Sequence, residues 1–113
     1  MEGGAGVGWG TAVVRGRSML PTLRDGDVLL VRYGGRPRPG SVIVVRLPEG
    51  RPLSIKRATR HTPDGWWVER DSQAEGVDSW LVGAIPDSDV IAVALARLWP
   101  RPRPMRSRAR PRH

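Results

Sequence analysis

Residues 27 to 47, DVLLVRYGGRPRPGSVIVVRL, give the clearest indication of the fold. Two apolar runs rich in valine, leucine and isoleucine flank a segment that contains consecutive glycines and two prolines. Branched aliphatic residues favour strands, whereas glycine and proline favour turns. The stretch therefore predicts two strands, over residues 27 to 33 and 41 to 47, with a turn-rich connection between them.

The same pattern of short apolar runs and turns extends along most of the chain. Turn residues recur about every eight to twelve positions, which predicts further strands at residues 11 to 15, 53 to 59, 65 to 70 and 89 to 98. The last run, VIAVALARLW, is also compatible with a helix, because alanine and leucine favour one. The sequence predicts a mostly β domain: a compact, partly closed, antiparallel β-barrel-like fold.

Length and charge limit the domain organisation. A chain of 113 residues forms one domain with a modest core. Its net charge of +8 resides mainly in residues 101 to 113, which hold six arginines and no acidic residue. This arginine- and proline-rich segment has one large apolar residue, so we expect it to be a disordered tail. We expect a folded domain over residues 11 to 100 and a flexible N-terminus over residues 1 to 10.

The composition also excludes classes of site. The chain has no cysteine and therefore no disulfide or thiol nucleophile, and with only two histidines we expect no metal centre and no cofactor. No apolar run approaches the roughly 20 residues of a membrane helix. The first ten residues lack the basic and apolar regions of a secretory signal. We expect a cytoplasmic protein without a membrane span.

A serine beside a rigid turn, Ser18 in RGRSMLPTLRDGDVLL (residues 15 to 30), is the first candidate for chemistry. A serine hydroxyl is a weak nucleophile unless a base removes its proton. One available base is His61, although it lies in a turn where an exposed histidine is the ordinary interpretation. The other is Lys56, the only lysine among 19 basic residues. Arginine stays protonated at any useful pH, whereas a buried lysine can lose its proton.

The strand that carries Lys56 suits a general base. Alternation along residues 53 to 59 places Lys56 on the same face as the small residues Ser54 and Ala58, which leave room for its side chain. Desolvation there would lower the pKa of the lysine from ~10.4 toward the working pH. The alternative is an exposed strand lysine, because most lysines are solvated.

These residues resemble sequence boxes of the type I signal peptidases. Residues 16 to 23, GRSMLPTL, followed by Gly26-Asp27, resemble their Ser-Met-x-Pro-Thr-Leu nucleophile box, and Lys56-Arg57 resembles their Lys-Arg box. A third box has its counterpart in Asp71, Asp78-Ser79, Gly83 and Pro86. The separation of 38 residues between Ser18 and Lys56 is closer to the self-cleaving SOS-repressor branch of the same Ser/Lys superfamily.

The resemblance implies a serine endopeptidase that acts on a protein or peptide substrate. It assigns the nucleophile to Ser18 and the general base to Lys56, and it makes the Ser18 backbone N–H part of an oxyanion hole. It assigns substrate and oxyanion binding to the neighbours of the nucleophile, Gly16, Arg17, Met19 and Pro21, with Gly16 letting a substrate backbone approach closely. It assigns the support of the site to Arg57, Asp71, Ser72, Asp78 and Ser79. The alternative for Arg57 and Asp71 is an ordinary solvated pair.

The chain departs from the third box at four positions, because it has Arg70, Ser72, Gly76 and Trp80 where the family has glycine, asparagine, serine and arginine. The box set without a membrane anchor, the strand GWWV at residues 65 to 68 and the Trp-Pro ending at residues 99 to 100 resemble the nickel-type superoxide dismutase maturation proteases. That resemblance implies the removal of a leader from a protein precursor.

Two other interpretations stay open. The first is a basic β module that binds nucleic acid through its arginine tail, and the second is a self-cleaving domain of the SOS-repressor type. The tail has no aromatic residue to stack on bases, so we do not expect nucleic acid as a partner. About ten residues precede the first expected strand, which leaves little room for a cleavable linker, although Ala5-Gly6 is present.

Overall fold

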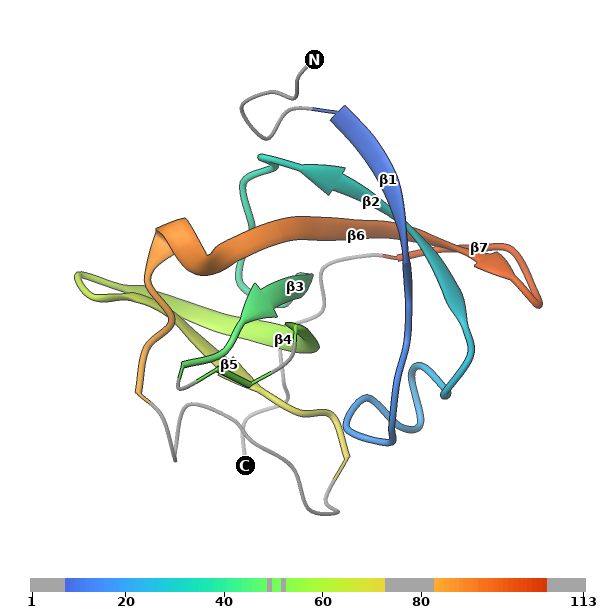
Figure 1. Cartoon of the computed structure of the whole chain (residues 1–113), viewed down its shortest axis with the longest axis horizontal. Coiled ribbons are helices and arrows are strands. Elements are labelled where there is room, and N and C mark those ends of the chain that lie inside the picture. Colours follow the sequence, from blue (N-terminus) through green and yellow to red (C-terminus); the bar gives the residue numbers. More distant parts are fainter. Residues whose placement is uncertain (1–7, 49, 52, 73–82, 106–113) are drawn as a thin grey trace.

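The computed structural model describes residues 8 to 48, 50 to 51, 53 to 72 and 83 to 105. Within them the chain forms one antiparallel sheet in the order β1-β2-β6-β3-β4-β5, with β7 beside β6 (Figure 1). A 3-10 turn, η1 (Asp87–Asp89), precedes β6. The strands are β1 (Gly8–Val13), β2 (Val28–Tyr33), β3 (Val42–Arg46), β4 (Leu53–Thr62), β5 (Gly65–Glu69), β6 (Val90–Trp99) and β7 (Arg103–Pro104).

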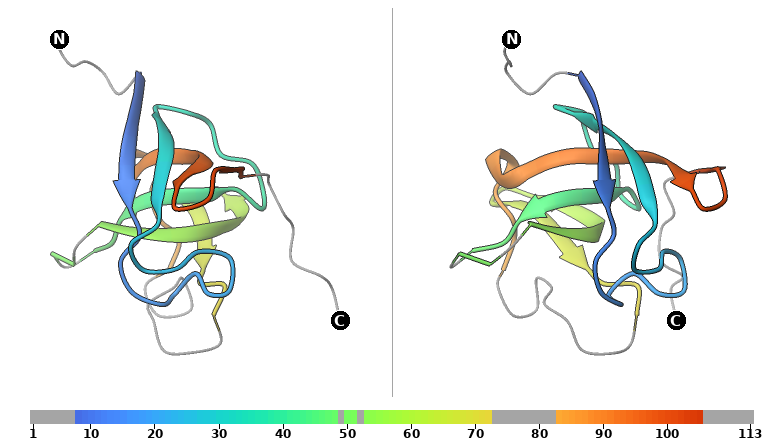
Figure 2. Two further views of the ribbon diagram at one scale, coloured as in Figure 1. Left: turned by 90° about the vertical axis from the view of Figure 1, so that its right-hand side faces the viewer. Right: turned by 45° about the vertical axis from the view of Figure 1, so that its right-hand side comes forward.

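The sheet is strongly twisted but it is not closed into a barrel. In the described part of the chain, β1 and β5 end the strand order and do not pair with each other. Irregularities interrupt the registers of β2–β6, β3–β6 and β4–β5, and such bulges bend strands and increase their twist. As a result β1 runs crosswise to β3 and β4 (Figures 1 and 2). The predicted antiparallel β class is confirmed, whereas the predicted partial closure into a barrel is wrong, because the end strands stay unpaired with each other.

All six predicted strands are present, with shifted ends. Residues 90 to 99 form a strand, so the helical alternative for this run is wrong. Both edges of β6 are hydrogen-bonded, to β2 on one side and to β3 on the other. These ladders outweigh the weak helix preference of alanine and leucine, which is typical where tertiary pairing competes with intrinsic propensity.

The ends of the folded part differ from the expected boundaries. β1 begins at Gly8, inside the segment expected to be a flexible N-terminus. Residues 101 to 105 fell in the expected tail, yet Arg103 pairs with Arg97 and the Met105 amide donates to the Leu95 carbonyl at 2.7 Å. Residues 106 to 113 lie outside the described residues.

Two hydrophobic cores lie on opposite sides of β3. Val42 and Val44 contribute to the first core, and Ile43 and Val45 contribute to the second. Burial on both faces accounts for the uninterrupted apolar run SVIVVRL in the sequence. The first core also contains Met19 and Leu23 from the turn that follows β1, whereas the second contains Trp66 and Ile85 and lies under β4 and β5. The first core therefore anchors the segment that carries Ser18.

Candidate active site

Ser18 lies, half-buried, in the long turn between β1 and β2. The turn is closed by the Gly16 amide, which donates to Asp25 Oδ1 at 2.8 Å. Gly16 has φ +82° and its backbone therefore favours glycine. Met19 and Leu23, each 1% exposed, anchor the turn in the first core. The hydrogen bond to Asp25 and the buried side chains of Met19 and Leu23 thus hold the turn in place, and Ser18 has a defined position.

The predicted neighbours of Ser18 divide into buried and exposed residues. Met19 is a core residue, whereas Arg17 and Pro21 are exposed on the turn. Gly16 was expected to let a substrate backbone approach closely. A Cβ at Gly16 would meet nothing within 4 Å, so the structure explains this glycine by its backbone conformation.

Lys56 lies in the middle of β4 and is buried, with 3% of its surface exposed. It pairs in register with Ile43 of β3. The alternative of an exposed strand lysine is therefore wrong. Its neighbours on the same face are the half-buried Ser54 and the fully buried Ala58, as the alternation predicts.

The residue after Lys56, Arg57, binds Asp71 through two parallel hydrogen bonds. Arg57 Nε donates to Asp71 Oδ1 at 3.0 Å, and Arg57 Nη2 donates to Oδ2 at 2.6 Å. The two side chains are 5% and 11% exposed, so the alternative of a solvated pair is wrong. Arg57 Nη1 donates to the Gly40 carbonyl at 2.8 Å. Such a bidentate, charge-assisted pair fixes both side chains in one geometry.

Asp71 and Ser72 connect this ion pair to the Ser18 turn. The Thr22 hydroxyl donates to Asp71 Oδ2 at 2.7 Å. The Ser72 amide donates to the Ser18 carbonyl at 2.9 Å. The segment that follows β5 therefore joins the turn that carries Ser18 to the strand that carries Lys56.

The structure connects the segments of Ser18 and Lys56 through Arg57, Asp71 and Ser72. Hydrogen bonds between catalytic groups are often long before a substrate binds, so this geometry is compatible with a serine and its base.

Several predicted positions have no counterpart in this network. Asp78 and Ser79, together with the departures at Gly76 and Trp80, lie outside the described residues. His61 lies elsewhere: its Nε2 is 3.0 Å from Asp87 Oδ1, and its ring is 4.9 Å from the ring of Trp66. Within the described residues His61 makes no contact with the Ser18 turn that would let it serve as its base.

Sequence reasoning missed three supporting residues. Thr22 lies inside the nucleophile box, but nothing local shows that its hydroxyl reaches Asp71, 49 residues away. Asp25 closes the turn onto Gly16. Arg97 of β6 lies with Nη1 3.4 Å from Oδ2 of the buried Asp27, which also accepts a hydrogen bond from the Arg24 amide. The Thr22–Asp71 and Arg97–Asp27 contacts join residues 49 and 70 positions apart, and no short pattern marks them.

A cavity of about 310 Å³ lies between β1 and β4. Within the described residues, β1 pairs only with β2. The second edge of β1, whose residues Thr11 to Val13 line the cavity, can therefore pair with an extended peptide. The lining is mostly apolar: Thr11, Ala12, Val13, Val31, Tyr33, Val44, Leu53, Ser54, Ile55, Ile91 and Ala92.

Two further features of the described residues concern metals and membranes. No group of three or more histidine, aspartate or glutamate side chains lies together there in a way that could hold a metal ion. No helix there has the length and apolar character needed to cross a bilayer.

In this site one network of hydrogen bonds connects the turn that carries a serine to the strand that carries a buried lysine. The sequence model of the Peptidase S24-like family matches residues 9 to 74, more than half of the chain and the part that contains Ser18, Lys56 and Asp71. The chain therefore belongs to the Peptidase S24-like family, within the Ser/Lys peptidase superfamily. No curated protein matched the chain.

Proposed function

We propose that this protein is a serine endopeptidase that uses Ser18 as nucleophile and Lys56 as general base. The observation that carries the proposal is the Asp71 network, which ties the Lys56-Arg57 strand to the Ser18 turn through Thr22. Membership of a peptidase family that includes both segments supports it. The burial of Lys56 supports it as well, because burial disfavours an ammonium and favours the neutral amine that a base requires.

The proposed reaction proceeds in two steps. Ser18 Oγ attacks the scissile carbonyl carbon while its proton moves to the Lys56 amine, and the resulting ammonium then protonates the leaving amine as the peptide bond breaks. In the second step Lys56 takes a proton from water, the water oxygen attacks the acyl carbon, and Ser18 Oγ leaves with that proton. Such activation by an adjacent base is what a hydroxyl nucleophile needs.

The developing oxyanion would be stabilised by the Ser18 backbone N–H. Among the described residues the only hydrogen bond of Ser18 is accepted by its carbonyl, so this amide is available to a substrate. The loss of one such donor typically lowers the rate by a factor of about 10² to 10³. The arrangement of the turn, held by Gly16 and Asp25, would keep this donor in place before the substrate arrives.

The substrate would bind as an extended strand in the cavity between β1 and β4. The second edge of β1 would supply backbone hydrogen bonds, and the apolar lining would accept aliphatic side chains. β1 leads into the Ser18 turn and the first half of β4 leads to Lys56, so a peptide in the cavity would extend toward both residues. This arrangement supports cleavage of an unfolded segment, such as a leader, in preference to a folded domain.

The particular substrate that we propose is the precursor of a nickel-type superoxide dismutase, with the reaction taking place in the cytoplasm. The proposal rests on the sequence resemblance to the maturation proteases of that enzyme. Co-expression of the precursor with the wild-type protein, or with Ser18→Ala, tests it by intact mass. Loss of the leader with the wild-type protein alone supports this substrate. A precursor that stays intact with an enzyme active on other peptides would exclude it.

A further inference from the structure

A second cavity, separate from the cavity between β1 and β4, lies at a break along one edge of β6. β3 pairs with this strand up to Val93, and the chain after β7 pairs with it through the Met105 amide and the Leu95 carbonyl. The cavity of about 220 Å³ lies where these two paired segments meet. Eight residues line it: Arg36, Arg38, Ser41, Val42, Val93, Ala94, Leu95 and Met105.

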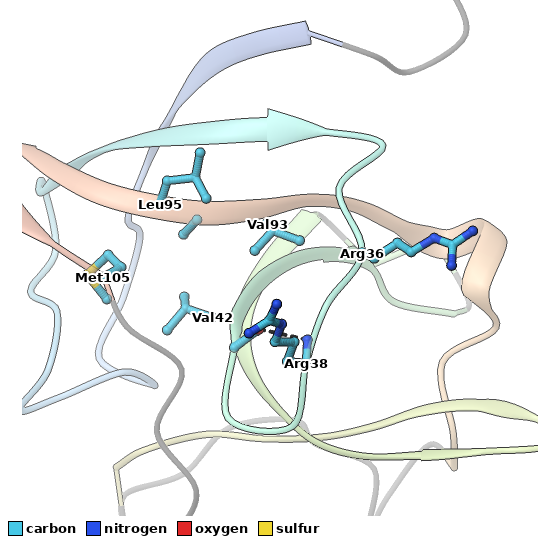
Figure 3. A pocket seen from close by; sticks show the side chains of 8 residues that line it. Arg36, Arg38, Val42, Val93, Leu95 and Met105 are labelled. Carbon is cyan, nitrogen blue, oxygen red and sulfur yellow. Dashed lines mark hydrogen bonds between the residues drawn. The ribbon is translucent and has the colours of Figure 1, made fainter.

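The cavity combines an apolar floor with a basic rim. The floor consists of aliphatic side chains and a methionine, and no acidic residue belongs to the lining. In Figure 3 the Arg38 side chain lies beside Val42 and Val93, whereas Arg36 points away along the rim. The Arg38 amide donates to Ser41 Oγ at 2.9 Å, which fixes the turn that presents these arginines. A ligand for this cavity carries both an apolar group and negative charge.

The surrounding charge reinforces this preference. The exposed Arg103 belongs to β7 and lies two residues before Met105 of the cavity wall. The tail itself is a poor occupant, because its guanidinium groups would face those of Arg36 and Arg38. The acidic Asp27 is already paired with Arg97 of β6. The arginines of the lining therefore favour an anionic partner.

We propose that this cavity binds an acidic peptide segment of a protein partner, with one aliphatic side chain in the cavity and carboxylates on Arg36 and Arg38. The volume is below the ~300 Å³ of a typical small-molecule pocket and fits a single side chain. Carboxylates match the planar guanidinium fork. A nucleic acid matches the charge but brings no aliphatic group for the floor. The inference does not depend on peptidase activity, because Ser18 and Lys56 do not belong to this cavity.

Fluorescence anisotropy tests the proposal with the full-length Ser18→Ala protein and a labelled peptide, Asp-Glu-Asp-Leu-Asp-Glu-Asp. We expect Arg38→Gln to weaken binding about tenfold, since it removes a charge-assisted contact. Arg46→Gln is the matched control, because it removes one charge at the other end of β3 and should change affinity less than about twofold. Replacement of the peptide leucine by glycine should also weaken binding about fivefold.

Three results would overturn the proposal. Equal losses for Arg38→Gln and Arg46→Gln would mean that general positive charge attracts the peptide. Undiminished binding of the glycine peptide would mean that the apolar floor takes no side chain. Stronger binding of an oligothymidylate than of the leucine peptide would identify the surface as a nucleic-acid site. Thermal melting of each variant, with an unchanged midpoint, ensures that lost binding is not lost folding.

Discussion

Arg57 and Asp71 form a bidentate ion pair in which Nε donates to Oδ1 at 3.0 Å and Nη2 donates to Oδ2 at 2.6 Å. Arg57 lies directly after Lys56 on β4, and Asp71 also accepts the Thr22 hydroxyl from the turn that carries Ser18. The pair therefore connects the two segments that carry the proposed catalytic residues. Its removal should affect both stability and the position of the catalytic groups.

Substitution Asp71→Asn should destabilise the protein and reduce peptidase activity. It leaves the buried Arg57 charge without a full counter-charge, and the breaking of a buried pair costs ~3–5 kcal/mol of the free energy of unfolding. Urea unfolding measures the effect. The control is Asp89→Asn, whose partner Arg46 is 3.6 Å away and solvent-exposed; it should cost at most ~1 kcal/mol. Equal costs for the two variants would contradict a structural role for the buried pair.

Substitution Thr22→Val should reduce turnover more than stability. It preserves volume and removes the hydroxyl that joins the Ser18 turn to Asp71, a hydrogen bond with a typical net contribution of ~1 kcal/mol. Kinetics on a cleaved peptide should show a lower kcat with little change in KM. Thr22→Ser, which keeps the hydroxyl, should restore most of the rate. A Thr22→Ser enzyme as slow as Thr22→Val would instead point to packing of the methyl group.

Substitution Gly16→Ala should destabilise the turn by ~1–2 kcal/mol, because a residue with a Cβ is strained in the left-handed region. The added methyl group meets nothing within 4 Å, so the effect arises from backbone conformation and not from a clash. Equilibrium unfolding tests this against Gly16→Asn, since asparagine tolerates the left-handed region better. If alanine and asparagine were equally neutral, φ +82° would not be the reason for a glycine here.

Substitution Thr11→Trp should raise KM for a peptide substrate by about tenfold with a smaller effect on kcat, because it fills the cavity between β1 and β4. Thr11 is exposed on β1, so the larger side chain does not disturb the cores. Ser88→Trp, on the exposed η1 turn, is the control of equal bulk away from the cavity. An unchanged KM for Thr11→Trp would place the substrate elsewhere.

Local patterns predicted most of the fold. The strands follow from short apolar runs between turn residues, and a branched run such as residues 41 to 47 has few other structures available to it. Whether the sheet closes into a barrel could not be predicted in the same way, because closure depends on bulges and on the pairing of strands far apart in sequence. The pairing of Arg103 with Arg97 was also missed, since backbone ladders need no apolar side chains.

The candidate site could likewise be predicted only in part from local patterns. Composition identified Lys56 as unusual, and alternation placed it on a face with small neighbours. Its burial depends on the packing of β3 against β4, and the contact between Thr22 and Asp71 spans 49 residues. Such contacts form only in the folded sheet. The sequence could therefore identify Ser18 and Lys56 but not the Thr22–Asp71 hydrogen bond that connects their segments.

Incubation with a diverse peptide library, followed by mass spectrometry, tests whether Ser18 and Lys56 cleave peptides together. The wild-type protein should cleave, Ser18→Ala should not, and Lys56→Arg should lose at least ~10³-fold in rate, since arginine keeps the charge and cannot act as a base. His61→Ala should stay within about twofold of the wild type. Cleavage by Ser18→Ala, or near-normal cleavage by Lys56→Arg, would show that Ser18 and Lys56 are not the nucleophile and the base.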